Sequence, residues 1–253
     1  MIEEPYRWVE AIANRREYIE TQLASGSPIV AVSCNDGILF VTMGSGRQKI
    51  FEIYDRIAMG AIGHPGDIER LRMAAIELAS TEGFTRSAAD VSLRRLAHYS
   101  LSPVMKTAFE QVYGAPYLAR LLFAEIGPTV EQDLFLRLDC DGSIASAGAG
   151  RDPFGAISGT REATQAIETH LRAEHRADST FAASLEVALD AWAAAQIVNT
   201  DTKQAPSREQ ITKERAERSQ NSSVEAALLE RSNERAIRYR QLTADEIRSA
   251  TGG

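Results

Sequence analysis

The stretch that decides the fold is Ser27–Gly46, SPIVAVSCNDGILFVTMGSG. It holds two short runs rich in β-forming residues, joined by Asn35-Asp36-Gly37. An Asp-Gly pair between two such runs is a strong signal for a β-hairpin, because its residues tolerate the positive φ angles of tight turns. The stretch therefore predicts an antiparallel strand pair.

The residues before this hairpin predict a helix from about Pro5 to Leu23. Trp8, Ile12, Ile19 and Leu23 recur at helical spacing, and Gly26 can stop the helix. The apolar face could pack on its own domain or on a neighbouring subunit, and the sequence leaves both alternatives open.

The residues after the hairpin, GRQKIFEIYDRIAMGAIG, predict two more strands, Lys49–Ile53 and Arg56–Ile62. The chain then breaks at Gly63-His64-Pro65-Gly66. Pro65 suits the first turn of a helix, which we expect to bury Leu71 and Leu78 and to end at Gly83.

The rest of the chain again alternates pairs of helices with blocks of strands. We expect a helix over Ser87–Val112, kinked or divided at Pro103 because proline removes a backbone donor. Val104 should lie on its buried side. We expect strands within 116–127 and 131–146, with a turn at Asp141-Gly142. After the glycine-rich connection AGAGRDPF, a short strand is expected at 154–158. Two more helices should follow, at Thr160–Ala173 and Ser179–Ala195.

Residues 199–222 are polar and have little to bury, so we interpret them as a mobile or solvent-exposed insertion, with a charged helix over Arg208–Arg218 as an option. A strand pair around Ser232-Asn233 follows. Thr243 and Glu246 match a capping box for a last short helix. Pairs of helices between blocks of antiparallel strands favour one α+β domain, two packed sheets between helix layers.

Composition excludes several classes of protein. The 253 residues carry 28 basic and 35 acidic side chains, a net charge of -7, which argues against a nucleic-acid partner. Cys34 and Cys140 are too few for a disulfide framework, and no apolar run approaches the roughly 18 residues of a membrane helix. We expect a soluble cytoplasmic protein with no membrane partner.

No metal or cofactor is predicted. The four histidines, His64, His98, His170 and His175, show no metal-binding spacing. GAGRDP does not match a phosphate-binding loop.

The order of elements, with GSPIVAVSCNDGILFV, KIFEIYDRIAMGAIGHPGDIERLR, PYLARLLFAEIG and LDCDGSIAS, resembles the proteasome α/β subunit family. The resemblance covers nearly the whole chain outside 199–222 and is nearest to the bacterial, actinobacterial-type α-subunits. It implies the four-layer αββα sandwich of N-terminal-nucleophile hydrolases with an added N-terminal helix. We accordingly divide the chain into a gate or ring-interface helix, 1–24, and a proteasome-type domain, 25–253.

Catalytic members of this family use a freed N-terminal Thr, Ser or Cys as nucleophile and its own amine as base. The resemblance places Ser27 at that position, so a self-processed serine hydrolase is one alternative. Met43 falls where the catalytic aspartate is expected, however, and the loop GSGRQK is too short to hold the lysine in its usual place. The patterned helix before Gly26 is also unlike a disposable propeptide.

The resemblance to α-type subunits implies a non-catalytic role instead. Such subunits form heptameric rings, stack on catalytic β-subunits, control access to their chamber and bind the C-terminal tails of ring-shaped ATPases or other activators. The tail-binding positions of the family fall on Lys49, Gly26, Gly63 and His64. A leucine is common in the family at the position of His64. Without the family, Lys49 would be interpreted as a solvated strand-edge lysine.

Ring contacts are expected through Trp8, Ile12 and Ile19, and contacts with the catalytic ring through Arg70 or Arg72. The Tyr-Asp-Arg gate motif of archaeal and eukaryotic α-subunits is absent from the N-terminus. A proteasome-like ring without a catalytic partner is the third alternative.

Overall fold

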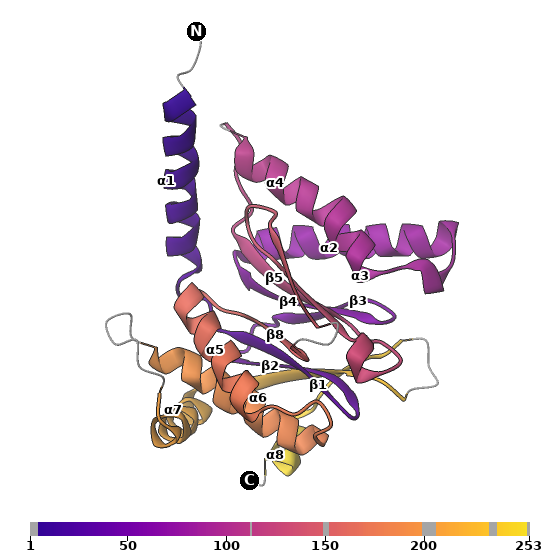
Figure 1. Ribbon diagram of the computed structural model, residues 1–253, viewed down its shortest axis with the longest axis vertical. Coiled ribbons are helices and arrows are strands. Elements are labelled where there is room, and N and C mark those ends of the chain that lie inside the picture. The colour runs from indigo at the N-terminus through magenta and orange to yellow at the C-terminus, as the bar shows by residue number, and fades with distance from the viewer. Residues whose placement is uncertain (1–4, 112, 149–151, 199–205, 233–236, 252–253) are drawn as a thin grey trace.

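The computed structural model describes residues 5–111, 113–148, 152–198, 206–232 and 237–251 (Figure 1). In chain order its elements are α1 (Pro5–Leu23), β1 (Ile29–Cys34), β2 (Gly37–Gly44), β3 (Ile50–Tyr54), β4 (Ile57–Gly63), α2 (Pro65–Thr85), η1 (Ala88–Asp90), α3 (Leu93–Arg95), η2 (Leu96–Leu101), α4 (Ser102–Glu110), β5 (Ala119–Glu125), η3 (Val130–Gln132), β6 (Leu134–Leu138), β7 (Ile144–Gly148), β8 (Phe154–Ile157), α5 (Arg161–Glu174), α6 (Phe181–Ile197), α7 (Arg208–Asn221), β9 (Ser223–Glu230), β10 (Tyr239–Gln241) and α8 (Ala244–Ala250).

Two five-stranded antiparallel sheets form the centre of the molecule. Their strand orders are β10-β9-β2-β1-β8 and β3-β4-β5-β6-β7. The predicted hairpin is present, with Cys34 paired to Gly37 and Ile29 paired to Thr42. Gly37 has φ +149°, and a Cβ there would lie 1.8 Å from the carbonyl oxygen of Leu229, so the turn requires glycine.

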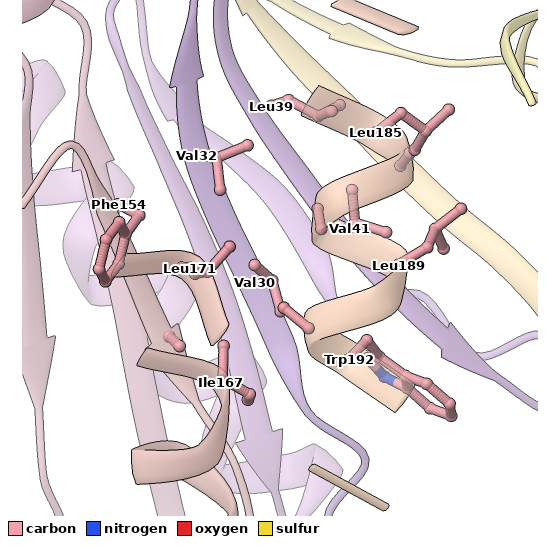
Figure 2. Close-up of a cluster of buried hydrophobic side chains, with 14 of the residues drawn as sticks. Val30, Val32, Leu39, Val41, Phe154, Ile167, Leu171, Leu185, Leu189 and Trp192 are labelled. Carbon is pink, nitrogen blue, oxygen red and sulfur yellow. The ribbon is translucent and has the colours of Figure 1, made fainter. Parts of the chain in front are cut away.

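Alternate side chains of the same strand belong to different core layers, which is what makes the architecture four-layered. Val30 and Val32 of β1 face helices α5 and α6 (Figure 2), whereas Ile29 and Ala31 pack between the sheets. A third cluster lies between the second sheet and the α2–α4 helices. The predicted four-layer αββα sandwich with an N-terminal helix is thereby confirmed.

Helix α1 is fastened to the domain by its last two turns. Ile19 and Leu23 are fully buried against Phe109 and Cys140. Arg120, only 3% exposed, donates to Glu20 of α1, to Asp139 and to the carbonyl oxygen of Ser158. The beginning of α1 projects beyond this attachment (Figure 1).

The helix layer over the second sheet differs from the sequence prediction. Helix α2 runs past Gly83 to Thr85. Gly83 makes room for Tyr54, whose Oη would lie 2.1 Å from an added Cβ, and does not end the helix. The expected Ser87–Val112 helix is divided into η1, α3, the π-helix η2 and α4, with Pro103 in the first turn of α4. Two side chains expected to be buried are partly exposed, Leu78 and Val104.

The C-terminal third also needs a correction. Arg208–Arg218 is helical, within α7, but this helix is not a free insertion: Ile211 is 5% exposed in the core, and Arg215 pairs with Glu186 and Asp190 of α6. Residues 199–205 and Asn233 lie outside the described ranges. The capping box at Thr243 and Glu246 is present. Across the described ranges, no helix has the length and apolarity needed to cross a bilayer.

Candidate functional site

Lys49 lies at the corner where the two sheets meet. Its carbonyl oxygen accepts a hydrogen bond from the backbone N–H of Ala61 in β4, at 3.0 Å. Its own N–H, and that of Ile50, donate to the carboxylate of Glu225 at 2.9 to 3.0 Å. Lys49 is therefore positioned by one strand from each sheet.

The Lys49 side chain runs along Gly44 in a cavity of about 200 Å³. A Cβ at Gly44 would lie 3.4 Å from the lysine Nζ, so the ammonium passes close to a residue that has no side chain. The cavity is lined by Thr42, Gly44, Gly46, Arg47, Gln48, Lys49, Ser223, Val224, Glu225, Gln241 and Leu242.

The two central charges of this cavity are both partly desolvated. Burial lowers the pKa of Lys49, and the nearby charge of Glu225 opposes that shift. Burial raises the pKa of Glu225, opposed by its hydrogen bonds to the Lys49 and Ile50 backbone. Within the described part of the chain, the Lys49 ammonium makes no ion pair shorter than 4.0 Å. A half-buried ammonium of this kind gains most from a ligand carboxylate.

The predicted pocket glycines both lie at the end of β4, because Gly26 packs on Ile62, the residue before Gly63. Gly26 follows α1, and a Cβ there would lie 3.2 Å from Cδ1 of Ile62, the β4 residue next to Ala61. Gly63 has φ +130°, and its missing Cβ allows the close approach of the Leu118 carbonyl oxygen. His64 is exposed and caps α2 by accepting from the Gly66 N–H at 3.2 Å.

A second cavity, of about 410 Å³, adjoins the first and shares Gly44 with it. Gly26 and Ser27 line it, together with residues of α5, α6 and α7. Through Ala61 and Ile62, β4 thus contacts both Lys49 and Gly26, which line two cavities that meet at Gly44, whereas Gly63 and His64 line neither cavity.

The Ser27 hydroxyl is bound to the backbone of β2. Its hydroxyl donates to the carbonyl oxygen of Met43 at 2.5 Å. The Met43 side chain is buried in the helix-facing cluster. Among the described residues, no hydrogen bond joins the Ser27 hydroxyl to a lysine, histidine or carboxylate.

The expected ring-interface residues differ in exposure. Trp8 is 40% exposed and Ile12 is half-buried, and both border a cavity of about 420 Å³ between α1 and α4. Ile19 is 0% exposed within its own chain, which corrects the expectation that it faces a neighbour. Its burial follows from the contact of the last turns of α1 with Phe109.

Metal ligands do not gather in the described ranges, where no group of three or more His, Cys, Asp and Glu side chains is placed to hold an ion. Among the histidines, His175 is buried beside Phe154 and burial lowers its pKa. Sequence reasoning missed Glu225. Its one signal was a lone acid near the start of the apolar strand SVEAALLE, which is easily interpreted as a solvated strand end.

Comparison with known proteins adds an independent observation. A model described as "Proteasome subunit" matches residues 23–201. Three relatives named "Proteasome subunit alpha" come from Frankia alni (35% identical, 72% of this chain and 73% of the relative), Streptomyces avermitilis (31%, 94% and 85%) and Kineococcus radiotolerans (30%, 96% and 95%). The predicted resemblance to actinobacterial subunits of this type is confirmed.

Proposed function

This chain belongs to the proteasome subunit family, and on that premise we propose that it is a non-catalytic α-type subunit, which forms the outer, heptameric ring of a cytoplasmic protease complex. The ring controls the access of substrates to catalytic β-subunits. Lys49 binds the terminal carboxylate of an activator's C-terminal tail.

The observation that carries the docking role is the state of the Lys49 ammonium. It is partly desolvated, it makes no direct ion pair among the described residues, and its cavity adjoins, at Gly44, the cavity that Gly26 lines. A solvated strand-edge lysine would lie in water with its pKa unshifted. A compact carboxylate on a mobile tail compensates this charge without rearranging the protein.

The non-catalytic part of the proposal is supported by the attachment of α1. Cleavage before Ser27 would uncover Phe109 and Cys140 and remove Glu20 from the buried Arg120. Because Asp139 still compensates Arg120 and Glu20 is partly exposed, losing this ion pair costs about 1–2 kcal/mol, to which the exposure of Phe109 and Cys140 adds. A propeptide that is removed in the mature protein would not be expected to hold the core in this manner.

Ring assembly is proposed through the exposed part of α1, which carries Trp8 and Ile12. Contact with the catalytic ring is proposed through α2. Each of Arg70 and Arg72 pairs with an acid of α2 and lies over an aromatic ring, but Arg70 is 71% exposed against 25% for Arg72 and is therefore better suited to that contact.

The direct test is degradation of a folded substrate by the assembled complex with and without its ring ATPase. Lys49→Ala should assemble normally and lose the ATPase-stimulated rate, while the unstimulated peptidase rate stays unchanged. Arg47→Ala is the matched control, because Arg47 is an exposed cation on the rim of the same cavity. Wild-type stimulation in Lys49→Ala would refute the docking role.

Two alternatives make different predictions. A self-processed hydrolase acting through Ser27 requires the loss of residues 1–26, which the intact mass of the purified protein would reveal. A ring that works without a catalytic partner requires that no β-subunit with an N-terminal threonine co-purify with it.

A further inference from the structure

The cavity that holds Lys49 also holds a fixed carboxylate, and this second charge bears on which tails can bind. Glu225 comes from β9, in the other sheet, where it is paired with Thr42. Arg47, Lys49 and Glu225 are the charged residues that line the cavity. Arg47 is exposed, so its charge is screened by water, whereas burial shifts the pKa of both other groups.

Glu225 is held away from the lysine by the backbone. Its carboxylate accepts hydrogen bonds from two backbone N–H groups. Oε1 accepts from Lys49 and from Ile50, and Oε2 also accepts from the Lys49 N–H. To pair directly with the Lys49 ammonium, the Glu225 carboxylate would have to give up these hydrogen bonds to the backbone at the start of β3. A carboxylate has about four acceptor positions, so these three contacts leave one unused on a side chain that lines the cavity.

We infer that Glu225 determines the specificity of the site: it rejects a tail whose last side chain is acidic and favours one that brings a donor or a cation. This inference rests on the proposed docking of a tail at Lys49. With the terminal carboxylate on the lysine, a cavity of about 200 Å³ leaves the last residue's side chain and amide N–H near Glu225. Two carboxylates in one partly desolvated cavity repel, whereas an N–H or ammonium completes the hydrogen bonding of Glu225.

The test uses three fluorescent peptides that copy the last eight residues of the ring ATPase co-purifying with the complex, with the final residue changed to Gln, Glu or Lys. Binding to the assembled full-length protein is measured by fluorescence anisotropy. The Glu peptide should bind about tenfold more weakly than the Gln peptide, and the Lys peptide at least as tightly as the Gln peptide.

The variants separate this inference from the proposal beneath it. Glu225→Gln should reduce the Gln-to-Glu affinity ratio to within about twofold, while Lys213→Gln, which removes an exposed cation of α7 outside the cavity, should leave the wild-type ratio nearly unchanged. Equal binding of the Gln and Glu peptides to the wild-type protein would overturn the role of Glu225 alone. Absence of binding by all three peptides would overturn the docking at Lys49 and this inference with it.

A further measurement does not depend on the variant's folding. On the wild-type protein, the Gln-to-Glu ratio should shrink as salt is raised from about 0.05 to 0.5 M, since the discrimination is electrostatic. A ratio that is present but independent of salt would contradict it.

Discussion

Replacing Glu20 by Ala tests whether α1 is a permanent part of the domain. Glu20 is 27% exposed and accepts from the guanidinium of Arg120 at 3.1 and 3.2 Å, while Arg120 itself is 3% exposed. The variant leaves a buried cation with one carboxylate, Asp139, at 3.2 Å and one carbonyl oxygen, that of Ser158, at 2.8 Å.

The expected loss of stability depends on the partners that Arg120 keeps in the variant. Removing one partner of a buried ion pair costs about 3–5 kcal/mol. Asp139 still compensates Arg120, and Glu20 is partly hydrated, so we expect about 1–2 kcal/mol. For a chain of this size that corresponds to a fall in Tm of roughly 2–8 °C.

The assay is thermal unfolding followed by circular dichroism, with Glu17→Ala as the matched control. Glu17 is an exposed acid on the same helix, so both variants lose one negative charge and gain the same helix propensity. Equal Tm values for the two variants would refute the conclusion that Glu20 and Arg120 fasten α1 to the core.

Three further predictions concern other parts of the molecule. Burial lowers the pKa of His175, so the folded state favours the neutral imidazole. The stability that this preference contributes should be lost as the pH falls below about 6.5, where the unfolded chain takes up the proton. Between pH 7 and 5, the free energy of unfolding in urea should therefore fall less for His175→Phe than for the wild type. Ile211→Ala should lower the free energy of unfolding by about 2 kcal/mol, because Ile211 is the side chain by which α7 enters the core. A change below about 0.5 kcal/mol would mean that α7 is not packed on α6. Gly83→Ala should cost about 1–3 kcal/mol through its clash with the Tyr54 Oη, and Tyr54→Phe in the same chain should recover part of that loss; no recovery would place the strain elsewhere.

The sequence predicted those parts of the fold that local chemistry determines. The Asn35-Asp36-Gly37 turn, the end of α1 at Leu23 and the capping box at Thr243 each depend on a few neighbouring residues, and all three are present. The order of helix pairs and strand blocks indicated two sheets between helix layers, and the resemblance to a family identified this arrangement as the four-layer αββα sandwich.

What the sequence could not predict depends on contacts between distant residues. Gly83 resembles a helix stop until Tyr54, far away in the chain, is seen to occupy its space. Residues 208–221 are polar apart from Ile211 and Ala216 and seemed to have little to bury, yet Ile211 packs in the core. Lys49 was found through the family, but Glu225, 176 positions further along, was not, because only the meeting of two sheets brings it to the Lys49 backbone.

The central claim is that Lys49 recognises a terminal carboxylate, and one measurement tests it most directly. The C-terminal peptide of the co-purifying ring ATPase is compared as its free acid and as its C-terminal amide, by anisotropy, on the wild-type protein and on Lys49→Ala. The free acid should bind the wild type at least about tenfold more tightly than the amide, and the two should bind Lys49→Ala alike. Equal affinities of acid and amide for the wild type would contradict the account.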